Sequence, residues 1–242
     1  MAADPGPQVP DMPGSQVPAT PGPQVPATIE EFRALAHTRL DSFPRIAVPD
    51  APGMRRAAVV LCVVDTGETL AVIVIKRAYQ GRNAGQWGLP GGRVESGETL
   101  AHAAARELHE ELGLTTRDAD VLGVLDDFPA ASGFAITPVV ATLADTSALH
   151  PSPDEVYSVH FVDLTRLAAD DTPHWIPPGP ATPGAAVPAE GTGLLQMRLA
   201  PDMTIHAPTG AMLWQFREVV LRARPPAQAR VADFLQPDWT HH

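Results

Sequence analysis

Residues 92–114 read GRVESGETLAHAAARELHEELGL, and their local chemistry predicts a glycine-containing turn followed by one short helix. The segment SGET at 96–99 supplies capping side chains ahead of a run rich in alanine and leucine, so the helix is expected to begin near Thr99. Gly113 stands where a left-handed C-cap residue belongs. The expected helix therefore covers about residues 98–112.

Three glutamates share one face of this expected helix. Glu107, Glu110 and Glu111 are spaced i, i+3 and i+4, which places them on one stripe. The apolar positions fall on a different face, which can pack on a sheet: Ala101, Ala105, Leu108 and Leu112. Hard divalent cations take oxygen ligands, and Mg²⁺ in particular is held by a few carboxylates together with substrate phosphates. The alternative interpretation of three such glutamates is a solvent-exposed acidic face without a function.

The spacing of this segment resembles the Nudix box, G-x5-E-x7-R-E-U-x-E-E-x-G-U, where U is aliphatic. The matching positions are Gly92, Glu98, Arg106, Glu107, Leu108, Glu110, Glu111, Gly113 and Leu114. The chain is similar to Nudix hydrolases on these residues. That resemblance implies the α/β (α+β) class, with a Nudix-type α/β/α sandwich around a mixed β-sheet. It also implies hydrolysis of the diphosphate bond in a nucleoside diphosphate linked to another moiety.

The resemblance further implies a metal site. Glu107, Glu110, Glu111 and the carbonyl of Gly92 would be the ligands, and the ion would be Mg²⁺ or Mn²⁺. Such an ion neutralises the charge of a diphosphate and acidifies the attacking water. The turn LPGG at 89–92 suits this role because glycines let backbone groups come close to a metal and to a diphosphate.

Three further residues receive roles from the same resemblance. Arg106 is expected to orient the glutamates through a bidentate pair, and Glu98 to tie the loop to the helix. One of the box glutamates, or a carboxylate from a later loop, would accept the proton of the attacking water. Glu155, in the sequence SPDE, is the candidate loop carboxylate, and a solvent-exposed turn acid is its alternative interpretation.

Residues 75–92, IKRAYQGRNAGQWGLPGG, are similar to the coenzyme A pyrophosphatase branch, whose signature is R-[ST]-x3-R-x3-G-x3-F-P-G-G. The matching positions are Arg77, Arg82, Pro90, Gly91 and Gly92. Ala78 replaces the Ser/Thr, Leu89 replaces the Phe, and the segment is one residue short after Arg82. Arginines suit phosphate contacts, so the candidate substrate-binding residues are Arg77, Arg82, Gly91 and Gly92. Basic loop residues that serve only solubility are the alternative.

The substrate implied by this branch is CoA or acyl-CoA, cleaved to 3′,5′-ADP and a 4′-phosphopantetheine species. The departures from the signature keep other substrates of the same enzyme class open, namely ADP-ribose, NADH, a (deoxy)nucleoside triphosphate or a dinucleoside polyphosphate. An alternative of another class is a non-catalytic nucleotide-sensing Nudix module. A small-molecule nucleotide diphosphate is the expected partner. Nudix enzymes are often homodimers, but no interface pattern stands out in this chain.

Composition excludes several other classes of protein. The 242 residues carry a net charge of −11, which argues against a protein that binds the nucleic-acid backbone. No apolar run reaches transmembrane length, and the N-terminus has neither a basic nor an apolar leader region. No membrane partner is therefore expected, and a cytoplasmic location follows as the default. Cys62 is the only cysteine, so no intramolecular disulfide can form, and a buried strand position is expected for it.

The chain divides into four expected parts. Residues 1–28 are a Pro-rich repeat expected to be disordered or polyproline-like, and residues 29–54 hold a helix to about Ser42 and a linker. Residues 55–222 form the Nudix domain, with a Pro/Gly-rich loop at 170–192, and residues 223–242 form a C-terminal tail. Strands are expected at 57–64, 70–76, 86–89, 121–125, 134–143, 156–162, 193–199 and 203–206, with further helices at 164–168 and 209–222.

Overall fold

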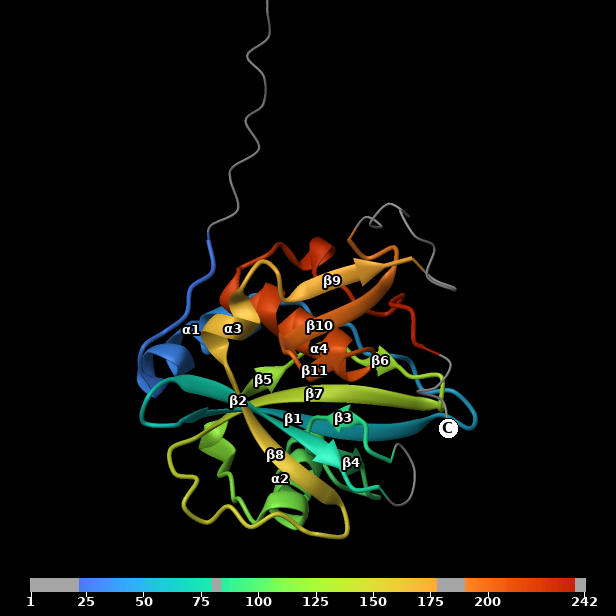
Figure 1. The fold of residues 1–242 in the computed structure, drawn as a ribbon. Helices are drawn as coiled ribbons and strands as arrows, with labels where there is room; N and C mark the ends of the chain where they lie inside the picture. The colour runs from blue at the N-terminus through green and yellow to red at the C-terminus, as the bar shows by residue number, and fades with distance from the viewer. Residues whose placement is uncertain (1–21, 80–83, 178–189, 238–242) are drawn as a thin grey trace, which may run out of the picture.

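A mixed sheet of eight strands organises the molecule, for which a computed structural model describes residues 22–79, 84–177 and 190–237 (Figure 1). Its order is β3-β2-β1-β7-β5, while β4 pairs with β1, β6 with β7, and β8 with β2. The strands are β1 (Arg55–Asp65), β2 (Leu70–Arg77), β3 (Trp87–Gly88), β4 (Gly91–Arg93), β5 (Val121–Val124), β6 (Phe128–Pro129), β7 (Phe134–Leu143) and β8 (Val156–Asp163). The pair β1–β7 is parallel, from Arg55 opposite Phe134 to Val64 opposite Leu143, and the other pairs are antiparallel.

Helices cover both faces of this sheet, as the sequence predicts. The helix α2 (Leu100–Leu112) lies on one face, and α1 (Ile29–Asp41), α3 (Leu164–Ala168) and α4 (Thr209–Phe216) lie on the other (Figure 1). Alternate residues of β1 supply two separate cores: Val60 and Cys62 join the core under α2, whereas Leu61 and Val63 join the core under α1 and α4. The predicted α/β/α sandwich with a mixed sheet is confirmed.

A second, three-stranded sheet lies on the side of α4, with the order β11-β10-β9 (Figure 1). Its strands are β9 (Pro173–Ile176), β10 (Leu194–Ala200) and β11 (Met203–Ile205). The predicted loop at 170–192 is wrong at β9, which pairs with β10 and buries Trp175 against Trp214 and Phe234. These partners are distant in sequence, so local composition did not indicate a strand. Residues 178–189 of the predicted loop lie outside the described residues.

Both ends of the described chain pack on the same core. Thr28 and Glu31 form a capping box at the start of α1, and Gln24 N donates to Leu221 O at 2.7 Å. Residues 1–21 of the predicted tail lie outside the described residues. The predicted helix at 209–222 is α-helical to Phe216 and π-helical over Arg217–Leu221. Short 3-10 turns occupy Asp118–Asp120 and Pro226–Gln228, and three residues beyond the second are buried, namely Ala229, Val231 and Phe234.

A buried acidic pair, Asp126 and Asp127, holds these ends to the sheet. Asp127 accepts hydrogen bonds from Arg45, Arg56, Thr137 Oγ1 and the amide of Val48. Asp126 accepts from the amide of Ile46, from Gln215 and from Arg230. The pair thereby joins the linker after α1, the helix α4 and the C-terminal segment, a role that the sequence did not indicate.

Across the described ranges, no helix combines the length and the apolar character that crossing a membrane requires.

Candidate active site

The helix α2 presents the acidic face toward the glycine turn. Thr99 Oγ1 accepts the amide of His102 at 3.2 Å and starts the helix, and Gly113, with φ +70°, ends it in the left-handed conformation. The helix therefore begins two residues later than predicted and ends at the predicted residue. Its apolar side chains pack on β1 and β7, so Glu107 and Glu111 are turned toward β4 and the turn before it.

Arg106 joins three carboxylates and the loop backbone. It contacts Glu98 through two nitrogens at 3.0 and 3.2 Å, and its Nη1 donates to both Glu107 and Glu110 at 2.9 Å. Its Nη2 also donates to the carbonyl of Arg93 at 3.0 Å. The bonds from Arg106 hold the pKa of Glu98 below its usual value. The guanidinium thus ties the loop to α2 and fixes the direction of the acidic face.

Glu111 is a buried carboxylate with few partners. Its side chain is 1 % exposed, its Oε2 accepts the amide of Gly91 at 3.1 Å, and its Oε1 lies 3.6 Å from Arg77. Burial raises the pKa of Glu111 to about 7, although Arg77 and the Gly91 amide oppose the shift. Burial also raises the pKa of Glu107, against the opposing charge of Arg106. In both carboxylates burial outweighs the nearby arginine, so the proton is held more tightly than on a free glutamate.

Glycine is required at both positions of the turn that faces these carboxylates. A Cβ on Gly92 would lie 2.3 Å from Oε1 of Glu107, so a side chain there would displace the carboxylate. Gly91 has φ +152°, and a Cβ on it would lie 2.4 Å from the carbonyl oxygen of Ala58. The backbone of the turn consequently lies directly against the acidic face, as the expected ligand role of Gly92 requires.

The donor chemistry here fits a hard divalent cation. The described residues hold no group of three or more His, Cys, Asp or Glu side chains gathered for a metal ion. Arg106 holds Glu107 and Glu110, and Glu110 is 53 % exposed on the outer side of the stripe. The available donors are nevertheless all oxygens: two carboxylates with raised pKa values, a third beside them, and the glycine-turn backbone. A cation would add positive charge beside the buried Glu111 and the half-buried Glu107.

Two candidate residues lie outside the box and the glycine turn, Glu155 and Arg82, and Glu155 lies near the site. The loop before β8 runs past the end of α2, where Ser152 N donates to Glu111 O at 2.8 Å. Glu155 is exposed on this loop, and its charge contributes to the raised pKa of both Glu107 and Glu111. Arg82 lies outside the described residues.

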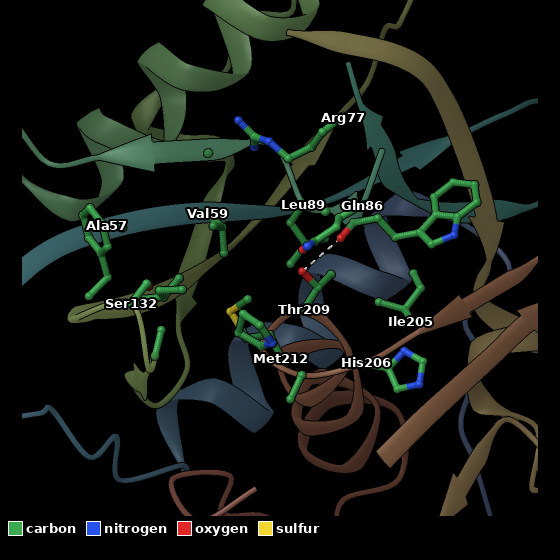
Figure 2. Close-up of a pocket in the computed structure, with 18 of the residues that line it drawn as sticks. Ala57, Val59, Arg77, Gln86, Leu89, Ser132, Ile205, His206, Thr209 and Met212 are labelled. Carbon is green, nitrogen blue, oxygen red and sulfur yellow. Dashed lines mark hydrogen bonds between the residues drawn. The ribbon is translucent and has the colours of Figure 1, made fainter. Parts of the chain in front are cut away.

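A cavity of about 660 Å³ opens beside the glycine turn. One wall holds Arg77 and Leu89, and the opposite wall comes from β11 and α4, with Ile205, Thr209 and Met212 (Figure 2). Among the described residues that line it, Arg77 and Arg93 are basic and none is acidic. Trp87 also lines the cavity, and its ring stands edge-on to that of His160 with the ring centroids 4.8 Å apart. The sequence did not indicate the wall from β11 and α4.

Comparison with known proteins establishes the family. A model of the NUDIX domain matches residues 54–183, so the chain belongs to the Nudix family. Relatives named "Uncharacterized Nudix hydrolase NudL", from Citrobacter koseri and Cronobacter sakazakii, are 36 % and 37 % identical over 113 residues. Each match covers 46 % of this chain and 59 % of the relative, so the chain spans about three-fifths of the length of these curated relatives.

A solved structure is also similar. The crystal structure of RenU, a Nudix hydrolase from M. smegmatis, shares 26 % sequence identity, with a TM-score of 0.37, over 48 % of this chain and 74 % of that one. The family match ends at residue 183, so the strands β10 and β11 and the helix α4 all follow it in the chain.

Proposed function

We propose that the chain is a metal-dependent hydrolase of the diphosphate bond in a nucleoside diphosphate linked to another moiety. The preferred substrate in this proposal is CoA or acyl-CoA, and the products are 3′,5′-ADP and a 4′-phosphopantetheine species. The observation that carries the proposal is the buried Glu111 carboxylate. It lies against the glycine turn, beside a cavity lined by arginines and by no acidic residue among those described.

The residues of the acidic face have two proposed roles, to bind the metal ion and to position its ligands. Glu107, Glu111 and the Gly92 carbonyl would hold the ion, with Glu110 as a further ligand once it turns from Arg106. Nudix hydrolases generally use divalent cations, and Mg²⁺ or Mn²⁺ bound here would neutralise diphosphate charge and acidify the attacking water. Arg106 positions the glutamates, and Glu98 holds Arg106. Catalysis of this kind depends mostly on positioning and electrostatic stabilisation.

The proton of the attacking water needs an acceptor close to this face. Glu155 fits that role, because it is exposed on the loop beside the end of α2 and its charge acts on Glu107 and Glu111. Glu111, as one of the box glutamates beside the glycine turn, is the alternative acceptor. A pH–rate profile of Glu155→Gln separates the two: loss of the acidic limb, on which the rate rises as the base loses its proton, identifies Glu155, and an unchanged limb identifies Glu111.

The phosphate end of the substrate would be bound by Arg77. Its guanidinium lines the cavity and also lies 3.6 Å from Glu111, so it spans the cavity and the acidic face. A planar, permanently charged guanidinium is suited to bidentate contacts with phosphate oxygens. Arg82 is proposed as a second phosphate contact from its place in the sequence signature.

The test is a substrate panel with Mg²⁺ or Mn²⁺, resolved by mass: CoA, acetyl-CoA, ADP-ribose, NADH, dATP and diadenosine tetraphosphate. Preferential release of 3′,5′-ADP from CoA supports the proposal, and the same assay on Arg77→Lys, which retains the charge but loses the planar fork, checks the phosphate contact. Preference for another member keeps the enzyme class and changes the substrate. A folded protein that binds nucleotides without cleaving any would be a nucleotide-sensing module.

A further inference from the structure

The cavity wall formed by β11 and α4 is held tightly on the core. Ile205, Ala207 and Met212 line the cavity and are at most 2 % exposed, so nearly all of each residue is packed against the core. Gln215, one turn further along the same helix segment, donates to Asp126 at 2.8 Å and to the carbonyl of Ala229 at 2.7 Å. The wall therefore has a fixed position on the core.

The same wall is bonded to β3, the strand just before the glycine turn. Thr209 Oγ1 donates to the carbonyl of Trp87 at 3.4 Å (Figure 2). Gly210 lets the backbone fold closely here, because a Cβ on it would lie 2.6 Å from the carbonyl oxygen of Ile205. A ligand whose diphosphate lies on the turn would thus place one of its two attached groups against residues 205–212.

The charge of the cavity changes from one end to the other. Both basic residues of its described lining, Arg77 and Arg93, lie with the glycine turn and β4. The opposite wall carries apolar side chains with a few neutral polar groups, and burial lowers the pKa of His206, whose ring is therefore uncharged at neutral pH. A cavity of about 660 Å³ lies within the range of small-molecule sites. Such a wall disfavours a second phosphate and favours an uncharged, partly apolar group.

We propose that the segment 205–212 binds the uncharged half of the substrate, away from the 3′-phosphorylated nucleotide, and that Met212 sets the size of the apolar group accepted. This inference rests on the proposed diphosphate hydrolysis. Figure 2 shows Thr209 and Met212 rising from α4 toward the strand that carries Val59. Met212 is unbranched and flexible, so its side chain can limit the cavity without a rigid clash. The role is one of specificity, because Met212 touches none of the reacting groups.

The experiment compares Met212→Trp and Met212→Ala with the matched variant Met203→Ala, which alters a buried methionine of β11 outside the cavity lining. The substrates are CoA, octanoyl-CoA, dodecanoyl-CoA and ADP-ribose, whose second half is polar. Met212→Trp should raise KM for octanoyl-CoA roughly tenfold relative to ADP-ribose, the scale expected for changes of pocket size. Met212→Ala should instead lower KM for dodecanoyl-CoA relative to KM for octanoyl-CoA. Met203→Ala should leave both of these KM ratios unchanged.

The outcomes separate this inference from the proposed function. If the wild-type protein cleaves these substrates but the ratios do not respond to Met212, the inference is overturned and the hydrolase stands. If the folded wild-type protein cleaves none of them, the proposed hydrolase fails. The dissociation constants of octanoyl-CoA and ADP-ribose, measured by calorimetry on the same variants, then decide the inference: a ratio shifted only at Met212 supports it, and unchanged ratios or no binding overturn it. Thermal melting checks each fold, and the opposite signs for Trp and Ala keep the test usable if one variant does not fold.

Discussion

Two groups of buried carboxylates in this protein have opposite surroundings. Asp127 accepts four hydrogen bonds, two of them from arginines, and Asp126 is held by Arg230, Gln215 and a backbone amide. Glu111, equally buried, has one backbone amide at 3.1 Å and an arginine at 3.6 Å. The aspartates have a complete set of protein partners, whereas Glu111 lies where a ligand can supply the missing charge.

The difference separates a structural from a functional use of the same chemistry. A buried charge whose partners all come from the protein holds distant segments in one arrangement, and removing it leaves those partners unpaired. A buried charge with few partners costs stability, and such groups are characteristic of functional sites. Four substitution experiments can break or sharpen this comparison.

The largest expected effect is on catalysis at Glu111. Glu111→Gln should lower kcat about 10³-fold, because a metal site supplies several kcal/mol of transition-state stabilisation and this change removes a ligand charge at nearly constant shape. The measurement is steady-state hydrolysis of the best substrate of the panel, with circular dichroism as the check of folding. Glu30→Gln, at an exposed position of α1, is the matched control. Near-normal turnover in Glu111→Gln would overturn the site assignment.

The next largest effect is on stability at Asp127. Asp127→Asn should lower the free energy of unfolding by about 4 kcal/mol, because it leaves Arg45 and Arg56 without their buried partner. Urea denaturation measures the change, and kcat of the remaining folded protein should stay near the wild-type value. Asp50→Asn is the control, since Asp50 pairs with the same Arg56 but is 94 % exposed, and a surface pair contributes about 0.5 kcal/mol. Equal effects at Asp127 and Asp50 would contradict the structural role of the buried aspartate.

A pH dependence of stability should distinguish Glu111 in the metal-free protein. Its pKa is raised from 4.5 to about 7 in the fold, so the folded state binds the proton more tightly than the unfolded state does. The contribution of Glu111 is therefore most favourable below about pH 4.5 and is lost as the pH rises toward 7. The full loss is roughly 3 kcal/mol, at about 1.4 kcal/mol for each pH unit.

Denaturation with a chelator present, at several pH values from 4.5 to 8, measures this loss. Glu111→Gln carries no titrating group and should lack most of the slope that the wild-type protein shows. Parallel curves for the two proteins would mean that Glu111 does not titrate in this range. The slope should also shrink when Mg²⁺ or Mn²⁺ replaces the chelator, because the cation stabilises the ionised carboxylates.

The smallest expected effect is at Arg106. Arg106→Lys retains the charge but loses the fork that joins Glu98, Glu107 and Glu110, so kcat should fall roughly 10- to 100-fold, the range found for residues that orient metal ligands. Steady-state kinetics and metal titration measure the loss. Arg117→Lys breaks a similar two-nitrogen pair with Asp120 away from the site and should leave kcat unchanged. A rise in KM with an unchanged kcat would instead assign Arg106 to substrate binding.

Short-range chemistry made most of the central fold predictable. The caps at Thr99 and Gly113 are properties of one helix, and they predicted α2 to within two residues. Its packing face was predicted only in part: Leu108 and Leu112 are buried, but Ala103 and Ala104 are buried in place of Ala101 and Ala105. The long strands are rich in apolar and β-branched residues, and β1, β2, β7 and β8 appear close to their expected limits. The strands β4, β6 and β9 were missed, because they are two to four residues long and depend on their pairing partners.

The sequence by itself therefore determined the Nudix box, the helix that carries its glutamates and the class of fold. Only the tertiary structure decided that Arg77 lies beside Glu111, that Asp126 and Asp127 join both ends of the chain, and that β11 and α4 close the cavity. The reason is physical. Capping and periodicity act within a few residues, whereas burial of a charge and the walls of a cavity depend on segments that meet only after the sheet has formed.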